Sequence, residues 1–484
     1  MLAVCPALMA GLVARPGEAA AQPLPSSDYS IDLFQGPLLA PIRVSGIAGA
    51  YAGYAEGIAG MVANAAAPAL REPNSASYLE LDIDLSISIP LSLTANDDYD
   101  NSGFSDSDYS SFLYLAWGGL IQYGSFGIGG LAELQRYTIA GEGVETDVTV
   151  GRYRALAAWQ FLGDQLIVGG GVRIATLGLD APDVPNLTLV GVAPEVGVLI
   201  RPDWQSFRIG ATYRAPVDGG TFYGGGDRTV DAGGIVRAGA LVLPEQVVLP
   251  WEIEVGVAVQ VGSRPLNPTW QNPRDQERLG AEAFVRRREE RRKLREEELA
   301  QISDPRERAR RRAKLMYEEK RAQAADDVAL GKLEDTLKYE RRARYWNWPR
   351  QYLLLTAEVL ATGDVERGVS LERFLGQSER RPARGRPVLG PPVIGSSGQS
   401  ISYSPRFGIE TEPVLNLMKT RFGSYYEPSR FREVGRQHFT FGADLRMFAT
   451  TWFSLVPEVI YKLQASIDIA PRYESYSLGI GVWR

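Results

Sequence analysis

Hydrophobic and polar residues alternate strictly over residues 78–93, YLELDIDLSISIPLSL. Side chains along a strand point alternately to its two faces, so one face of this segment is aliphatic. The other face carries Glu80, Asp82, Asp84 and two serines. Soluble strands run about five or six residues, whereas a tilted membrane-spanning strand needs about 9–11. The pattern predicts a wall strand of a transmembrane β-barrel, and a long half-buried strand of a soluble sandwich is the alternative.

The same two-residue period recurs along the rest of the chain. We expect further strands over 111–123, 126–139, 146–162, 165–179, 187–200, 207–216, 232–243, 251–262, 352–361, 369–375, 400–411, 419–426, 438–448, 453–469 and 476–483. The segment 369–375 has the weakest pattern of these. A closed barrel with both ends on one side needs an even number of strands. The expected fold is therefore an all-β antiparallel barrel of 14–16 strands, with fourteen if two segments do not span.

The connections alternate between tight turns, such as Gly124-Ser125, and longer loops, such as 96–108. Outer-membrane barrels have short periplasmic turns and longer external loops. This parity places both ends of the chain in the periplasm.

Residues 274–344 depart from the strand pattern, with 22 Lys/Arg and 17 Asp/Glu, or +5 net (22 − 17). They are strong helix formers, interrupted at Ser303-Asp304-Pro305, where a helix N-cap and a first-turn proline coincide. We expect a charged helical hairpin inserted between two wall strands. Loop parity places it outside the cell, and a miscounted strand would move it to the periplasm. Because acidic residues interleave with the arginines, a solvated helix is favoured over a nucleic-acid surface.

The beginning of the chain is typical of a secretory signal, with a short apolar core and a small-residue cleavage site at Ala19-Ala20-Ala21. The single cysteine, Cys5, lies within it. The expected organisation is a signal peptide over 1–21, a periplasmic lead and plug over 22–76, barrel strands over 77–263, the helical insertion over 264–348, and barrel strands over 349–484.

The sequence contains few residues that could form a catalytic site or a metal site. His438, the only histidine, lies in the alternating stretch HFTFGADL and is expected to be a wall residue, with no nucleophile elbow near it. We expect no catalytic residue, no enzymatic activity and no cofactor. The one candidate for a metal is the acidic loop at 98–109, in which Gly103 and four possible ligands match calcium-loop positions. The twelfth position holds Tyr109, and a solvated loop is favoured over a calcium site. The four possible ligands are Asp98, Asp100, Ser102 and Asp106.

The carboxylates of the first strand are expected to face the lumen. Glu80, Asp82 and Asp84 could polarise a permeation path. They could instead pair with inward arginines, because a large barrel must satisfy many inward polar groups. The arginines considered are Arg152, Arg154 and Arg173.

The small-residue segment 43–70 resembles the N-terminal plug of the outer-membrane long-chain fatty acid transporter family (FadL type). The residues that carry this resemblance are Gly46, Gly49, Tyr51, Gly53, Glu56, Gly57 and Asn64. This sequence departs from the family's Asn-Pro-Ala signature, since Ala65-Ala66 follow Asn64 and the proline is displaced to position 68. The stretches ALVLPEQVVLPWEIEVGVAV and SYSPRFGIE also look like the family. The resemblance implies a fourteen-stranded barrel closed by an N-terminal hatch, with hydrophobic ligands inside and a side opening in the wall.

These features predict a protein of the Gram-negative-type outer membrane that takes up small hydrophobic, fatty-acid-like molecules through a plugged barrel. The alternative is a non-transporting barrel that anchors the charged hairpin as an interaction platform. An apolar pocket beside the plug would favour transport, and a lumen filled with paired charges would favour the anchor. The expected partners are outer-membrane lipids, a hydrophobic ligand and the barrel assembly machinery, without nucleic acid; the sequence leaves the oligomeric state open.

Overall fold

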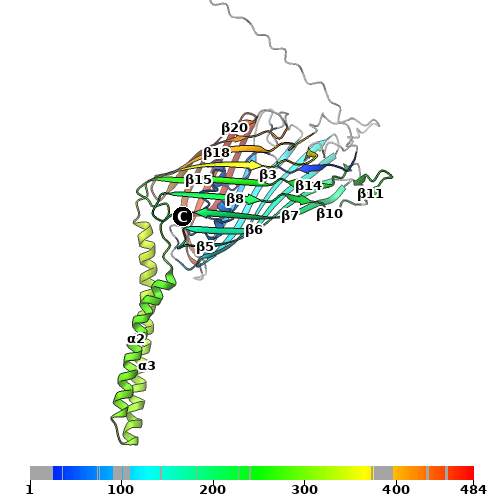
Figure 1. The fold of residues 1–484 in the computed structure, drawn as a ribbon. Helices are drawn as coiled ribbons and strands as arrows, with labels where there is room; N and C mark the ends of the chain where they lie inside the picture. Colours follow the sequence, from blue (N-terminus) through cyan, green and yellow to red (C-terminus); the bar gives the residue numbers. More distant parts are fainter. Residues whose placement is uncertain are drawn as a thin grey trace, which may run out of the picture.

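The wall of the molecule is a closed antiparallel β-barrel, seen from the side in the computed structural model of Figure 1. Its main sheet holds fifteen strands, of which β10 is a short addition to β7. The remaining fourteen form a ring, because β7 also pairs with β8. The expected barrel is confirmed, with the fourteen strands that the family resemblance implied.

The wall strands follow one another around the barrel in chain order. They are β2 (Leu79–Pro90), β3 (Tyr109–Tyr123), β4 (Phe126–Gly141), β5 (Val144–Phe161), β6 (Leu166–Ala181), β7 (Val184–Ile200), β8 (Phe207–Arg214), β15 (Glu252–Gly262), β16 (Tyr352–Thr362), β18 (Ser402–Val414), β19 (Met418–Glu427), β20 (Arg436–Trp452), β21 (Val456–Ala470) and β22 (Tyr473–Val482). The last strand, β22, pairs with the first, β2.

The structure describes residues 26–483 except 35, 73–74, 76, 91–96, 98–100, 102–108, 142–143, 182–183, 227, 239–240, 372–373, 375–395, 432–434 and 453–455. The expected signal peptide and the four calcium candidates, Asp98, Asp100, Ser102 and Asp106, lie outside the described residues.

Strand β2 has the two faces that its sequence predicts. Leu81 and Ile83 are 47% and 53% exposed on the outside of the barrel, whereas Asp82 and Ser86 are buried on the inside. Aromatic residues such as Trp117 and Trp159 are also exposed on the outer face. An apolar, aromatic-rich exterior over a closed antiparallel wall is the architecture of outer-membrane proteins, which face lipid.

Two of the expected strands do not cross the wall, and these two predictions were wrong. The segment 232–243 instead forms β12 (Val236–Ala238) and β13 (Leu241–Val242). In a small separate sheet, β12 pairs with both β13 and β11 (Arg228–Val230). The segment 369–375 contributes only β17 (Gly368–Ser370). Buried apolar residues such as Leu241 and Val369 pack inside the barrel mouth, so their local alternation does not reflect a lipid face.

A second sheet lies inside the end of the barrel that carries the longer loops. It joins β17, β1 (Ser30–Asp32), β14 (Gln246–Leu249) and β9 (Val217–Gly219), and β1 runs parallel to both of its neighbours. The expectation of a periplasmic lead before the plug was therefore wrong for the described part of 22–41. The chain enters the lumen from the loop end and runs towards the start of β2.

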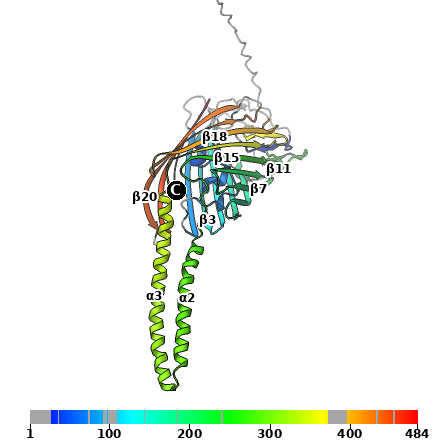
Figure 2. The same cartoon turned by 60° about the vertical axis from the view of Figure 1, so that its left-hand side comes forward.

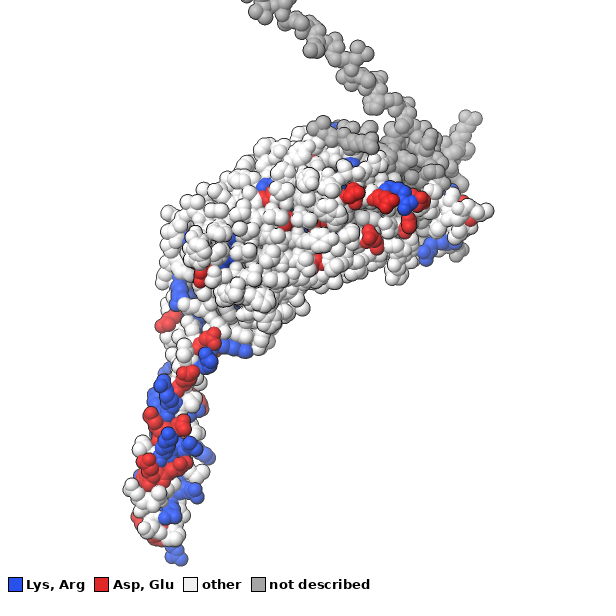
Figure 3. Space-filling model, in the orientation of Figure 1, with Lys and Arg blue, Asp and Glu red and all other residues white. Residues whose placement is uncertain are grey.

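The charged insertion is a helical hairpin of α2 (Pro273–Ala300) and α3 (Pro305–Trp346), which projects from one end of the barrel (Figures 1 and 2). The side chains of Asn272 and Asp304 cap the two helices. Charges of both signs cover it, whereas most of the barrel surface on the face seen in Figure 3 is uncharged. Ion pairs such as Arg291–Asp326 join the helices. No helix in the described chain is both long enough and apolar enough to cross a membrane.

The hairpin connects β15 to β16 at the end that also holds the start of β2, the end of β22 and tight turns such as Gly124-Ser125. The prediction that loop parity places it outside the cell was therefore wrong. Counting 232–243 as a wall strand adds one membrane crossing before the hairpin, and this extra crossing moves the expected position of the hairpin to the other side of the membrane. Short turns mark the periplasmic end of such barrels, which predicts that the hairpin extends about 60 Å into the periplasm at 1.5 Å per residue of α3.

We expect trypsin added to intact cells to leave the hairpin uncut, because the outer membrane shields it. Permeabilising the outer membrane should expose the many arginines of α2 and α3 and release fragments cleaved within 274–344. Immunoblotting with tags in the hairpin and at the C-terminus would measure this. Cleavage in intact cells, with a periplasmic marker protein still protected, would contradict the topology.

Candidate functional site

The lumen next to the periplasmic end is filled by residues 42–70, called the plug from here on. It contains α1 (Ile42–Ser45) and two short 3-10 helices, η1 (Ile58–Val62) and η2 (Ala67–Ala69). Every residue of the plug is buried. The residues chosen from the family resemblance all lie here; they are Gly46, Gly49, Tyr51, Gly53, Glu56, Gly57 and Asn64.

Glycines on the inner face of the wall allow the plug backbone to approach the strands directly. A Cβ added at Gly169 of β6 would collide with the carbonyl oxygen of Ala65, and one at Gly210 of β8 with that of Ala52. In the plug itself, Gly53 lies against Gly256 of β15 in the same way. The wall is therefore shaped to this plug, a fit that sequence reasoning missed because a wall glycine alone does not show what it faces.

Polar side chains of the wall and of the plug form hydrogen bonds with backbone groups of the plug. Glu358 of β16 accepts hydrogen bonds from the backbone N–H groups of Tyr51 (2.9 Å) and Ala52 (2.7 Å). The Nδ2 of Asn64 donates to the carbonyl oxygens of Ala52 (2.9 Å) and of Val198 in β7 (3.0 Å). Asn64 thus ties two parts of the plug to the wall.

Glu56 is the charged centre of the plug. Its carboxylate contacts Arg43 at 3.1 Å and Arg208 of β8 at 2.9 Å. Burial raises the pKa of Glu56, but the charges of Arg208 and Arg43 outweigh this effect and lower it overall. The pair of arginines therefore keeps Glu56 ionised inside the barrel.

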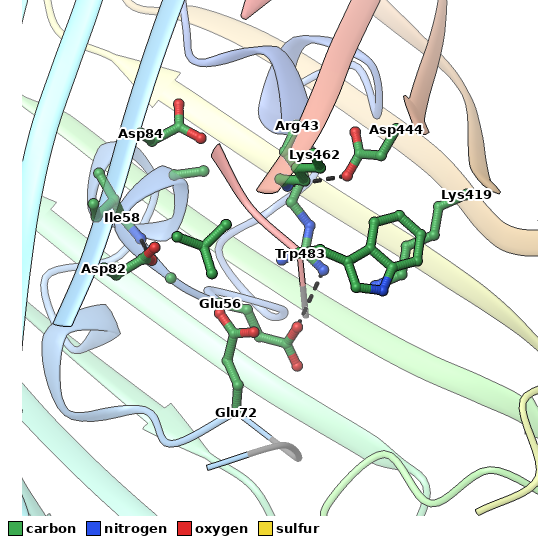
Figure 4. Close-up of a pocket in the computed structure, with 13 residues that line it drawn as sticks. Arg43, Glu56, Ile58, Glu72, Asp82, Asp84, Lys419, Asp444, Lys462 and Trp483 are labelled. Atoms are coloured by element: carbon green, nitrogen blue, oxygen red, sulfur yellow. Dashed lines mark hydrogen bonds and ion pairs between the residues drawn. The ribbon is translucent and has the colours of Figure 1, made fainter. Parts of the chain in front are cut away.

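The carboxylates of β2 do not pair with the arginines suggested for them. Asp82 accepts a hydrogen bond from the backbone N–H of Ile58 (3.3 Å), which lies beside it at a small cavity of about 20 Å³ (Figure 4). Asp84 accepts from Gln464 (2.9 Å), and Glu80 from the backbone of Ser77 (3.1 Å). Asp82 thus holds the plug, and the suggested pairing with Arg152, Arg154 and Arg173 was wrong.

Arg154 and Arg173 belong to a different set, the charge belt, which crosses the lumen on the loop side of the plug. Its members are Glu133, Arg154, Arg173, Glu195, Arg214, Glu252, Glu254, Glu358 and Arg406, joined in a chain of ion pairs. At its centre Arg214 of β8 contacts Glu195 at 3.2 Å and Glu254 at 3.1 Å. Arg152 lies in the same layer and donates to the carbonyl oxygen of Leu33 (3.2 Å).

Above the belt the inner face of the wall becomes apolar. Along β5 the inward residues change from Leu156 beside the plug, through Arg154 in the belt, to Val150 beyond it. The neighbouring strands repeat this order, and their outer ends supply an upper apolar cluster. Its wall members are Tyr137, Val148, Val150, Ala175, Leu177, Leu179, Leu187, Leu189 and Ala193. Because the interior of a membrane barrel is ordinarily polar, these residues mark a specialised zone.

The ladder of wall strands is interrupted beside this cluster. Strand β8 ends at Arg214, and the chain then turns into the lumen as β9 and returns as β10 (Thr221–Tyr223), which pairs with β7 at Thr188–Val190. Pairing of β7 with β8 covers only Glu195–Ile200. Residues 191–193 of β7 therefore have no ladder partner on that side in the described chain.

His438 lies inside the barrel, between two carboxylates. Its Nε2 is 2.6 Å from Glu427 and its Nδ1 is 2.9 Å from Asp468, with Tyr425 stacked on the ring. The hydroxyl of Tyr425 accepts a hydrogen bond from the backbone N–H of Leu38 (3.1 Å), just before the plug. The expected wall position is confirmed, and the structure adds a buried polar network. Within the described residues no group of His, Cys, Asp and Glu could hold a metal ion.

Comparison with known proteins gives matches only among solved structures: no family model and no curated protein matches the chain. It is similar to a FadL homologue of Pseudomonas aeruginosa (11% identity, 92% of this chain and 97% of that chain, TM-score 0.44). It is also similar to the Pseudomonas putida toluene transporter TodX (10%, 94% and 98%, TM-score 0.43) and to the CymD monoaromatic hydrocarbon channel (9%, 92% and 96%, TM-score 0.42). At these distances the matches identify no ligand for this chain.

Proposed function

We propose that this protein takes up small hydrophobic molecules across the outer membrane, with the plug (residues 42–70) as its gate. The observation that carries the proposal is the upper apolar cluster. A pore for polar solutes needs polar groups along its lining, whereas an apolar ligand gains free energy from an apolar lining.

The interruption of the wall at residues 191–193 of β7 supplies an entry route from the lipid. Gly191 faces Val217 and Gly219 of the inward detour, so only backbone and small side chains separate this point from the cluster. Val217 itself belongs to the upper apolar cluster. A hydrophobic molecule in the outer leaflet could therefore reach the cluster without crossing water, as the side opening of the resembled family implies.

In this proposal the seated plug is the closed gate. The cavity between the plug and the charge belt measures about 70 Å³ and is lined by Leu38, Val44, Val62 and belt arginines. Binding pockets for small molecules are several times larger, at about 300–1,000 Å³. Passage towards the periplasm therefore requires the plug to move away from the wall.

The alternative, a barrel that anchors the helical hairpin, is favoured by the paired charges of the charge belt and by the length of α3. Both features could serve a barrel that never opens. The two functions differ in which part of the chain they need, because transport uses the upper apolar cluster whereas anchoring uses the hairpin.

The test changes Leu177 and Leu189, which are cross-strand partners on β6 and β7 and are fully buried. We expect the double variant Leu177→Asn/Leu189→Asn to lower cellular uptake of the tracer N-phenyl-1-naphthylamine several-fold, because each unpaired buried amide costs about 1–3 kcal/mol. A matched control, Val172→Asn/Val196→Asn, changes two residues on the outer face, 40% and 54% exposed. Deleting residues 273–346 should leave uptake unchanged. Loss of uptake after the hairpin deletion, without loss in the leucine variant, would favour the anchor.

A further inference from the structure

A cleft of about 50 Å³ lies at the base of the helical hairpin, outside the plug and the charge belt. The chain between the plug and β2 forms one side of it, through Arg71, Glu72 and Ser75. The two ends of the hairpin form the other side, and their lining residues are Pro268, Thr269, Trp270, Gln271, Arg341, Arg344, Tyr345 and Trp348. By the topology described above, this cleft opens towards the periplasm.

Two donors that line the cleft have no hydrogen-bond partner among the described residues. They are the indole Nε1 of Trp270 and the hydroxyl of Tyr345. Tyr345 is 9% exposed, so its hydroxyl has little access to bulk water. Leaving such a group unsatisfied costs about 1–3 kcal/mol. An acceptor bound in the cleft would form hydrogen bonds with both donors and remove this cost.

The charges around the cleft favour an anionic acceptor. The lining residues include Arg71, Arg341 and Arg344 and one carboxylate, Glu72. The charge of Arg341 is balanced by Glu277, which lies 3.8 Å from it and does not line the cleft. The donors of Arg71 are bound to backbone oxygens such as that of Gly124 (2.8 Å), so its charge stays in place. Arg341 is also engaged, whereas Arg344 is exposed and makes no hydrogen bond or ion pair within the described chain. The arginines in the last turns of α3 also offset the partial negative charge of its C-terminus.

Aromatic rings provide the rest of the surface. The rings of Tyr345 and Trp348 lie 5.9 Å apart, edge to face, and Arg71 is stacked on Trp270 at 4.6 Å. Flat apolar groups gain free energy when they pack on such rings. The cleft thus combines a small polar cavity with an aromatic rim.

We propose that this cleft binds the carboxylate of a small molecule that carries a flat apolar body. The carboxylate oxygens accept hydrogen bonds from Trp270 Nε1–H and Tyr345 O–H, and Arg344 supplies the matching charge. The apolar body lies on the aromatic rim, because the cavity itself has room only for the polar group. This site is independent of the proposed transport, since binding here requires no movement of the plug.

Calorimetric titration of the purified full-length protein in detergent would test the site, with phenylacetate as the probe and phenylacetamide as its uncharged counterpart. We expect phenylacetate to bind about tenfold more tightly than phenylacetamide, because a hydrogen bond to a charged group contributes about 1.5–3 kcal/mol. Tyr345→Phe keeps the ring and removes the hydroxyl, and Arg344→Ala removes the charge. Each should weaken phenylacetate binding about fivefold or more. Arg344→Ala should leave phenylacetamide binding unchanged, because the amide carries no charge for Arg344 to balance.

Arg312→Ala is the matched control, because Arg312 is an exposed arginine at the far end of α3. It should bind phenylacetate as the unchanged protein does. Heat-modifiable gel mobility and helix content by circular dichroism would verify that each variant is folded. Equal binding of phenylacetate and phenylacetamide, or unchanged phenylacetate affinity in folded Tyr345→Phe and Arg344→Ala, would overturn the site. Because no uptake is measured, either of these results would leave the transport proposal standing.

Discussion

Gly169→Val should make the outer membrane leak small polar solutes while the barrel wall stays assembled. Gly169 faces the plug from β6, where an added Cβ would collide with the Ala65 carbonyl and lie 2.8 Å from Ala66 Cα. Both obstacles are backbone atoms, so the plug has to move. Overpacking costs about 1–3 kcal/mol, which shifts the balance between seated and displaced plug about five- to 150-fold. Liposome swelling in an arabinose solution would measure the leak.

Gly170→Val is the matched control, because the next residue along a strand points to the opposite face. A Cβ at Gly170 would meet only the wall, with the carbonyl oxygen of Glu195 at 3.1 Å and the side chain of Val196 at 3.4 Å. The control variant should stay sealed, and both variants should keep heat-modifiable mobility. Equal leakage from the two variants would mean that valine damages the wall itself, and the proposed fit between wall and plug would be lost.

Arg214→Met should destabilise the folded barrel by about 3–5 kcal/mol, the usual cost of removing one partner from a buried ionic network. Arg214 is 1% exposed and lies within 3.6 Å of Glu195, Glu252 and Glu254. Its loss would remove one positive charge from among these three carboxylates, although each keeps one other arginine nearby: Arg154, Arg173 and Arg406. Urea unfolding in phospholipid vesicles, followed by tryptophan fluorescence, would give the change in free energy of unfolding.

A compensating variant separates charge imbalance from lost packing. Adding Glu195→Gln and Glu254→Gln to Arg214→Met removes two of the unbalanced charges and keeps their shape. We expect this triple variant to recover most of the lost stability, because neutral amides need no counter-charge. A triple variant as unstable as Arg214→Met alone would show that the charge belt acts through packing, and its role as a network of balanced charges would have to be abandoned.

The sequence by itself determined the architecture of the wall, whereas the expectation that residues 43–70 fill the lumen came only from the family resemblance. A period of two over residues 78–93 places Ile83 towards lipid and Asp82 towards the lumen, because the faces of a strand follow from its backbone geometry alone. The small residues of 43–70 likewise indicated a segment packed closely against other backbone. The helical hairpin followed from helix-forming composition and the Ser303-Asp304-Pro305 break. Each of these features is local, and local patterns are visible in a single chain.

Only the tertiary structure decided which segments pair with which. The segment 232–243 alternates like a wall strand, yet it lies in the barrel mouth, because alternation records two different faces and does not say what each face meets. Counting that one segment as a wall strand placed the expected hairpin on the opposite side of the membrane from the position that the fourteen-strand count predicts. Similarly, Arg154 pairs with Glu133 and Glu195 on nearby strands, and Asp82 pairs with the plug. Ion pairs, the cleft beside Tyr345 and the role of Gly169 all depend on contacts between residues far apart in sequence, which form only when the barrel closes.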